Sequence, residues 1–272
     1  MTPHEGPLAA ADCLVPDWPA PEGVFALCTT RTGGVSLPPY DSLNLGTHVG
    51  DVAAAVHTNR MRLQSTVAAV ANGTRAVFLN QVHGDGVVHL DSSTPDGIDA
   101  DACVATAPGV ACTIMVADCL PILLTDRAGR WVAAAHAGWR GLAGVDGIGV
   151  LESLLNSALL SGTARQDILV WLGPCIGPQA FEVGPEVRAA FCADDPQAAS
   201  FFIPAAHEKS RADLAGLARL RLQRMGVLGV FGNDSGAAWC TFTQHSRFFS
   251  HRRDSRVLGQ SGRMAACIWL AD

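Results

Sequence analysis

The stretch ACTIMVADCLPILLTD, residues 111–126, places an acid and a thiol between two apolar runs and follows them closely with a proline. Each apolar run is short and rich in aliphatic residues, which predicts two buried strands. Pro121 has no N–H to contribute to a strand ladder, so it favours a change of pairing at this point. We therefore expect Asp118 and Cys119 to lie at a kink or crossing where one strand ends and the next begins.

Further strand-like and helix-like patterns alternate irregularly along the chain. Strands are expected at residues 23–30, 76–83, 86–91, 131–137, 168–174 and 265–270. Helices are expected at residues 52–70, 145–160, 184–193 and 213–226. Several strands follow one another from Ala76 to Ala137 without a helix, which favours mixed or antiparallel sheets over a doubly wound parallel sheet. The prediction is an α+β fold of mixed β-sheets with flanking helices, in one domain spanning residues 1–272, because no repeat or Pro/Ser linker divides it.

Composition restricts the class of protein. The chain has 272 residues, 49% of them hydrophobic, and a formal net charge of −6, which suits a buried core. No segment approaches the roughly 20 apolar residues of a membrane span, and the N-terminus lacks the pattern of a secretory signal. We therefore expect a cytoplasmic protein without a membrane partner. Because the arginines are scattered, nucleic acid is not an expected partner, whereas a small anion is compatible.

The nine cysteines form an odd set without a CxxC pair, which argues against a disulfide framework and against a zinc ribbon. Most of them are expected to be reduced and buried, because free cysteine behaves as a small hydrophobe. Cys119 stands apart because Asp118 precedes it.

A metal site is the first candidate for function. His83, Cys119 and His136 each end an apolar run, in NQVHGDGV, VADCLPIL and VAAAHAGWRG. Two imidazoles and a thiolate suit zinc and leave a fourth position open, as in catalytic sites. The same trio also suits a Cys–His hydrolase, in which a histidine deprotonates Cys119 and Asp118 orients the imidazole. A metal would occupy the lone pair that attack requires, so the two interpretations compete, and the residues leave both open.

Other polar residues are candidates for substrate binding. Arg140 precedes glycines and a predicted helix whose N-terminus would attract an anion, and Arg31 precedes a Gly-Gly pair, so both are candidates for gripping phosphate. Asn44 and Gln81 lie in glycine-flanked turns and are candidates for contacting a ribose hydroxyl or a base edge. Arg252 and Arg253 are adjacent in another turn-like segment, SHRRDS, and are also candidates for gripping an anion.

Two acids in GIDADAC, Asp99 and Asp101, are candidates for holding a histidine in one tautomer or for acting as an acid or base.

Taken together, these segments make the chain similar to the bacterial purine nucleoside phosphorylase and adenosine deaminase family. Its members have also been labelled laccase-like multicopper polyphenol oxidoreductases and peptidoglycan editing factors. The segments that carry the resemblance are TTRTGGVSLPPYDSLNLGTHVGD, NQVHGDGVV, DADACVA, VADCLPILLTD, AAAHAGWRGLAGV, LGPCIGPQAFEVGPEV, FFSHRRD and SGRMAACIWL. The resemblance implies that His83, Cys119 and His136 bind the metal. It also implies the α+β fold of the cytotoxic-necrotizing-factor toxins, a cysteine-hydrolase fold. The chain departs from the family's pattern at Ser261 and His251, where threonine and tyrosine are usual.

The resemblance implies a zinc-dependent enzyme that cleaves adenosine, inosine, guanosine and S-methyl-5′-thioadenosine with inorganic phosphate as co-substrate, and that also deaminates adenosine. Asp118 is the candidate proton shuttle in this scheme. The HxE and PCxxC segments of zinc deaminases are absent, so any deaminase activity would have to use a different scaffold.

Three alternatives stay open: a Cys–His amidase that edits peptidoglycan precursors, a copper-dependent polyphenol oxidase, and a ligand-binding protein without activity. Multicopper chemistry is disfavoured because the nine histidines include no HxH pair, although a His₂Cys site can take Cu²⁺ in vitro.

Overall fold

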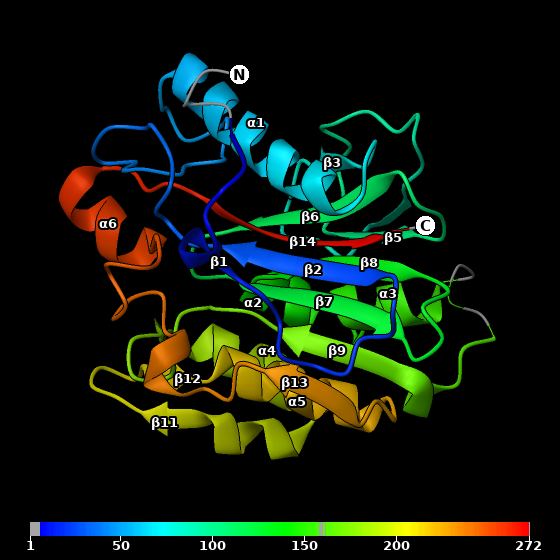
Figure 1. Ribbon diagram of the computed structural model, residues 1–272. Helices are drawn as coiled ribbons and strands as arrows, with labels where there is room; N and C mark the ends of the chain where they lie inside the picture. The colour runs from blue at the N-terminus through cyan, green and yellow to red at the C-terminus, as the bar shows by residue number, and fades with distance from the viewer. Residues whose placement is uncertain (1–5, 158–159, 161, 272) are drawn as a thin grey trace.

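The two apolar runs around Asp118 form strands of two different sheets in the computed structural model, which describes residues 6–157, 160 and 162–271. β6 (Val110–Val116) belongs to a five-stranded sheet, and β7 (Leu120–Asp126) belongs to a six-stranded sheet. The expected crossing is confirmed, because the chain passes from one sheet to the other through Asp118 and Cys119. Figure 1 shows the two sheets stacked, with β6 above β7.

The five-stranded sheet has the order β1-β2-β14-β6-β3. Its other strands are β1 (Cys13–Leu14), β2 (Val24–Thr29), β14 (Met264–Leu270) and β3 (Arg75–Phe78). β14 is antiparallel to both neighbours and pairs Ala266 with Cys28 and Ile114, whereas β3 and β6 are parallel. Helix α1 (Ala53–Val70) lies along this sheet in Figure 1 and buries one stripe of side chains against it.

The six-stranded sheet has the order β13-β9-β7-β8-β5-β4. Its other strands are β13 (Gly229–Gly232), β9 (Ile168–Leu172), β8 (Val132–Ala137), β5 (Ala102–Ala105) and β4 (Val87–His89). Parallel and antiparallel pairs both occur, so the predicted α+β fold with mixed sheets is confirmed. Every residue of β7 and β8 is buried, because one face packs on the first sheet and the other on helices.

Helices and a small sheet cover the outer face of the six-stranded sheet (Figure 1). The remaining helices are α2 (Trp139–Ala143), α3 (Val150–Asn156), α4 (Pro185–Asp194), α5 (Leu214–Arg224) and α6 (His251–Leu258). The three-stranded sheet contains β10 (Glu182–Val183), β12 (Ser210–Ala212) and β11 (Phe202–Pro204). Short 3-10 segments lie at Ala10–Asp12, Arg165–Asp167, Pro196–Phe201 and Ala237–Trp239.

Among the predicted elements, one helix and one strand differ most in their bounds from the structure. The helix expected at 145–160 begins only at Val150, because Val145 and Ile148 pair with each other in a tight turn. Residues 158–159 of that prediction lie outside the described residues. The strand expected at 76–83 ends at Phe78, so His83 lies in a loop.

Among the described residues, no helix has the length and apolar content needed to cross a membrane. The single domain, the cytoplasmic location and the likeness to the necrotizing-factor toxins stay predictions.

Candidate active site

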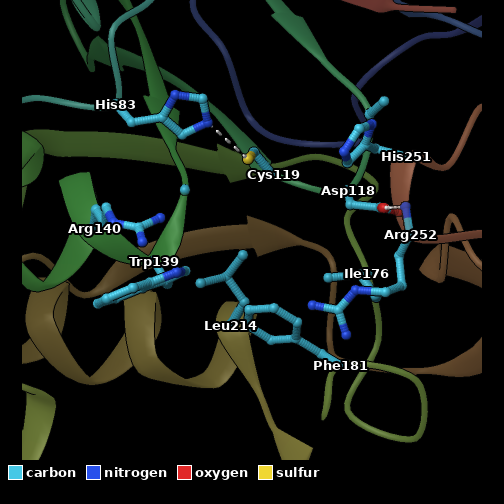
Figure 2. Close-up of a pocket in the computed structure, with 12 residues that line it drawn as sticks. His83, Asp118, Cys119, Trp139, Arg140, Ile176, Phe181, Leu214, His251 and Arg252 are labelled. Atoms are coloured by element: carbon cyan, nitrogen blue, oxygen red, sulfur yellow. Dashed lines mark hydrogen bonds between the residues drawn. The ribbon is translucent and has the colours of Figure 1, made fainter. Parts of the chain in front are cut away.

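The three side chains expected to form a metal site lie together at the crossing between the sheets. One potential ligand atom from each of His83, Cys119 and His136 lies within 4.8 Å of the other two. Cys119 Sγ is 3.8 Å from His83 Nε2, and the two imidazole rings meet edge to face at 81°. Figure 2 shows the ring of His83 directed at the sulfur. Two nitrogens and a sulfur thus converge on one point, although their residues are far apart in sequence.

Local backbone geometry explains this convergence. Cys119 directly precedes β7, and His136 of β8 lies opposite Pro121 of β7, so pairing of these strands brings the thiol and one imidazole to the same edge. His83 approaches from the loop with a left-handed backbone (φ 62°). Gly138, two residues after His136, lies against the other two side chains of the trio. A Cβ at this position would lie 2.9 Å from the His83 ring and 3.2 Å from Cys119 Sγ. A side chain at position 138 would therefore push the site apart.

Asp101 holds both imidazole-bearing segments. Its buried carboxylate accepts a hydrogen bond from His136 Nδ1 at 2.7 Å and from the backbone N–H of His83 at 3.0 Å and of Gly84 at 2.6 Å. The Nδ1 bond leaves Nε2 of His136 to serve as a ligand, an arrangement common at metal sites. Asp101 thus lies where the expected role in fixing a histidine tautomer requires it, whereas Asp99 hydrogen-bonds Asn80.

The electrostatics of the trio favour a charged pair. Burial alone would raise the pKa of Cys119, but the charge of His136 and hydrogen bonds from both histidines outweigh it and lower the pKa to about 6. Burial also acts to lower the pKa of His136, yet the charge of Cys119 and the hydrogen bond to Asp101 raise the pKa to about 9. At neutral pH, Cys119 is therefore a thiolate beside an imidazolium, and a metal ion would displace the imidazolium proton.

A first cavity of about 200 Å³ opens beside Cys119 and His83. Part of its wall is apolar or aromatic, from Trp139, Ile176, Phe181 and Leu214. The polar part contains Asp118, Arg140, His251 and Arg252. Figure 2 shows Trp139 and Phe181 on the side of the cavity away from the sulfur. The cavity thus offers a flat apolar ligand a surface close to the trio.

A second cavity of about 240 Å³ shares His83, Ala117, Cys119 and His251 with the first. Its remaining lining comes from other segments of the chain. These residues are His48, Leu79, Asn80, Gln81, Met115, Val116, His136 and Arg263. The trio therefore borders two cavities of different character.

Asp118 lines the first cavity, but its carboxylate already has partners. Oδ1 accepts a hydrogen bond from the Thr241 hydroxyl and Oδ2 accepts one from the backbone N–H of Arg252, both at 2.6 Å. Its backbone is left-handed (φ 86°), which turns the chain between the sheets. Asp118 therefore ties the first turn of α6 to the crossing.

Arg140 and Gln81 both line a cavity, but they differ in whether their polar atoms already have partners. The Arg140 guanidinium lies 4.5 Å from the centre of the Trp139 ring in the wall of the first cavity. The Gln81 side chain lines the second cavity, yet its amide is engaged with the backbone N–H and carbonyl of Met115 at 2.7 and 2.8 Å. Of these two predicted contacts, the cation of Arg140 is the better placed for a ligand.

Arg31 and Asn44 line neither cavity. The Arg31 guanidinium donates to Asp41 and to the carbonyl of His245. Asn44 is fully buried, and its amide oxygen accepts the backbone N–H of Arg263 at 2.9 Å. Polar atoms of both residues are bound within the protein, and their contact with substrate stays a prediction.

The helix after Arg140 also differs from the expectation. The backbone N–H of Gly149, at the start of α3, donates to the Glu152 carboxylate at 3.0 Å. An acidic side chain of the protein therefore already occupies the helix end that was expected to attract phosphate.

Several cavity residues escaped the sequence-based selection. Trp139, Phe181 and His48 also lie in segments of the resemblance, but no local pattern separates them from core or surface residues. His251 and Arg263 lie within or beside segments of the resemblance, FFSHRRD and SGRMAACIWL, which was the available signal.

The sequence model of the multi-copper polyphenol oxidoreductase laccase family matches residues 25–271. The chain belongs to this family. The resemblance inferred from the sequence is thereby confirmed. Purine nucleoside phosphorylase PA4543 of Pseudomonas aeruginosa is similar to this laccase-like chain, with 51% identity over 260 residues that cover 95% of this chain and 98% of the relative. Purine nucleoside phosphorylase YfiH of Escherichia coli is 49% identical over 257 residues, covering 94% of this chain and 98% of the relative.

Solved structures of similar proteins share the fold. Neisseria meningitidis protein NMB0706 superposes with a TM-score of 0.85 at 46% identity, covering 96% of this chain and all (100%) of that one. YlmD from Geobacillus stearothermophilus superposes with a TM-score of 0.82 at 31% identity, covering 92% and 93% of the two chains.

Proposed function

We propose that this laccase-like chain is a zinc-dependent purine nucleoside phosphorylase. It would cleave adenosine, inosine, guanosine and S-methyl-5′-thioadenosine with inorganic phosphate, and it would also deaminate adenosine. The observation that carries the proposal is the convergence of His83, Cys119 and His136 at the edge of a cavity with an aromatic wall. Relatives about half identical to this chain and named purine nucleoside phosphorylases support the same reaction.

The donor set suits zinc. Two imidazole nitrogens and one sulfur lie close enough to share an ion, and Asp101 orients His136 as an outer hydrogen-bond partner does in zinc proteins. A bound zinc ion would supply Lewis-acid chemistry and activate water at this point.

The first cavity would hold the purine. Trp139 and Phe181 offer flat faces to the base, and Leu214 and Ile176 extend the apolar wall. Arg140 and Arg252 are the cations of the wall, suited to the ribose hydroxyls or to a substrate anion. The nucleoside would thus be oriented with its sugar towards Cys119.

Asp118 stays the proposed proton shuttle. Its hydrogen bond with Thr241 permits this role because a hydroxyl both donates and accepts. When the carboxylate takes a proton, the threonine hydroxyl can rotate and accept it in turn, so the acid keeps a partner in either state. The backbone N–H of Arg252 holds the second oxygen in place meanwhile.

Product analysis tests the proposal. Purified, zinc-loaded protein is incubated with adenosine, with and without phosphate, beside the variants His136→Ala and His89→Ala. His89 is an exposed histidine that hydrogen-bonds Thr106 and serves as the matched control. Adenine and ribose 1-phosphate, formed only when phosphate is present, would show phosphorolysis, and inosine would show deamination. Unchanged adenosine in every tube contradicts the proposal.

A Cys–His hydrolase is the second candidate, favoured by one observation. Cys119, His136 and Asp101 follow one another as thiolate, imidazolium and carboxylate, and the pKa of Cys119 is lowered to about 6. This candidate includes the proposed likeness to the necrotizing-factor toxins and an amide substrate from cell-wall precursors. Amidase activity of metal-free protein, lost on alkylation of Cys119, would favour it over the zinc enzyme.

Copper-dependent oxidation of polyphenols is the candidate that the family description favours. His83, Cys119 and His136 form the single such ligand cluster found in the part of the chain that the structure describes. Copper competes well for such donors. Oxidase activity that rises in proportion to bound copper, with no nucleoside turnover by the zinc form, would support it.

A further inference from the structure

The second cavity is lined by donors that the proposed handling of the nucleoside does not use. Arg263, His48 and His251 all line it, and none of its lining residues is acidic. The two amides in its wall are engaged elsewhere, since Asn80 donates to Asp99 and Gln81 bonds to Met115. Apart from the trio itself, which also lines this cavity and would hold the metal, the available polar groups are a guanidinium and two imidazoles, which together suit an anion.

Arg263 is fixed by hydrogen bonds of its side chain, its backbone N–H and its backbone carbonyl. Its Nη1 donates to the carbonyls of Ser261 and Gly262 at 2.8 and 3.2 Å. Its backbone N–H donates to Asn44, and its carbonyl accepts the backbone N–H of Leu45 at 3.0 Å. Within the described part of the chain, Nε and Nη2 of Arg263 make no hydrogen bond, so this edge of the guanidinium is free to bind a ligand. The guanidinium is thus positioned before any ligand arrives.

The two cavities meet at the trio. Cys119 and His83 border both, but the first cavity extends towards α2 and α5, whereas the second extends towards β6 and Arg263. A flat apolar ligand in the first cavity and an anion in the second would therefore approach the same point from different sides. Displacement at a ribose carbon requires this arrangement, because the attacking group enters opposite the leaving base.

We propose that the second cavity is the phosphate subsite, where Arg263, assisted by His48 and His251, holds inorganic phosphate against the nucleoside. This inference rests on the proposed function and deepens it. Asn44, expected from the sequence to touch substrate, acts instead as a positioning residue for Arg263.

The reaction at this subsite balances without a further reactant. One phosphate oxygen forms a bond to ribose C1′ while the bond between C1′ and the purine nitrogen breaks. The electron pair of the broken bond leaves with the purine, which takes up the proton that the hydrogen phosphate dianion loses as it becomes the ester. Free base and ribose 1-phosphate result, and the charge of Arg263 holds the phosphate dianion in the attacking position.

The test measures phosphate binding and phosphate kinetics in the zinc-loaded full chain. Arg263→Gln removes the charge, and His48→Ala removes an exposed donor that makes no hydrogen bond among the described residues, so this variant spares the fold. Arg256→Gln, at an exposed arginine of α6, is the matched control. Binding of inorganic phosphate is followed by calorimetry, and KM is measured separately for phosphate and for inosine.

We expect Arg263→Gln to raise both the Kd and the KM for phosphate roughly 10- to 100-fold, and His48→Ala to raise them several-fold. The KM for inosine should change less than about threefold, and Arg256→Gln should behave as wild type. Phosphate binding that Arg263→Gln abolishes supports the subsite even if the wild type turns over no nucleoside, in which case only the proposed function fails. Phosphorolysis by the wild type with an unchanged phosphate KM in both variants overturns the subsite and leaves the proposed function standing. A wild type that neither binds phosphate nor reacts overturns both.

Discussion

Cys112 and Cys119 lie seven positions apart on the same segment, yet they occupy opposite environments. Cys112 lies in β6, fully buried, and its Sγ is 3.9 Å from the carbonyl oxygen of Val132. Burial, reinforced by neighbouring thiols such as Cys103, raises the pKa of Cys112 well above its usual range. Cys119 lies just past the end of the same strand, beside two imidazoles, and its pKa is lowered to about 6.

The difference shows that the end of the strand, rather than the residue type, makes the thiol reactive. Inside β6, both faces of the sheet are covered by apolar side chains, and a charged thiolate would lose its hydration without compensation. At the crossing, the chain leaves one sheet before it enters the next, so side chains from other segments can reach the sulfur. Substitution and alkylation of the two cysteines and of their partners test this contrast.

Cys119→Ser should remove the bound metal, whereas Cys112→Ser should leave the metal content unchanged. Loss of an outer hydrogen-bond partner alone costs about 10- to 100-fold in metal affinity, so loss of a ligand should cost well over ~100-fold. Metal analysis after dialysis of the two variants, side by side with wild type, checks this. Equal metal content in all three proteins would contradict the assignment of Cys119 as a ligand.

In metal-free protein at pH 7, Cys119 should be alkylated at least about 100-fold faster than Cys112. Iodoacetamide reacts with the thiolate, so the rate at Cys119 should increase as pH rises through about 6 and level off above about pH 7. Core thiols such as Cys267, whose pKa burial raises to about 12, should react only after unfolding. Peptide mass analysis across pH 5–9 provides the measurement. A rate at Cys119 that still climbs at pH 9 would show an ordinary thiol.

Asp101→Asn should lower metal affinity by about 10- to 100-fold, because His136 loses the carboxylate that fixes its tautomer. Asp99→Asn is the matched control two residues away, on an exposed acid that contacts Asn80. Competition with a chromophoric chelator gives both affinities. If both variants bind metal as the wild type does, Asp101 does not support the site.

Cys112→Ser should lower the free energy of unfolding by about 1–3 kcal/mol, because it buries a hydroxyl among apolar side chains. Cys119→Ser, compared in the metal-free state, should change it by less than about 1 kcal/mol, since this side chain is only partly buried. Urea denaturation of the metal-free proteins gives both values. Equal losses would show that the crossing is packed as tightly as the strand interior.

Much of the fold could be predicted from patterns within the sequence. The apolar runs indicated most strands of both large sheets, and the proline after Asp118 and Cys119 indicated their crossing. The helix expected from residue 213 begins at Leu214, and the Asp213 side chain caps it by accepting the backbone N–H of Gly216 at 2.9 Å. These features depend on local hydrogen bonding and on alternation of apolar residues, which neighbours in sequence suffice to specify.

The candidate site was predictable only in part. The trio was identifiable because each of His83, Cys119 and His136 places a nitrogen or sulfur atom that can bind a metal at the end of an apolar run. The partners that Arg31 and Asn44 find within the protein were not predictable, because nothing local shows whether an arginine or an amide will find such partners. Arg263 was missed for the converse reason, since its open edge depends on which segments surround it.

The sequence by itself determined the strand and helix pattern, the break in β structure at Asp118 and Cys119, and the chemical types of the ligands. Only the tertiary structure decided which groups meet and with what charge. Pairing of β7 with β8 sets His136 beside Cys119, and Asp101 and the left-handed turn at His83 complete the trio. The pKa of a thiol and the reach of a guanidinium depend on distances of a few ångströms between segments remote in sequence, and those distances exist only once the sheets are packed.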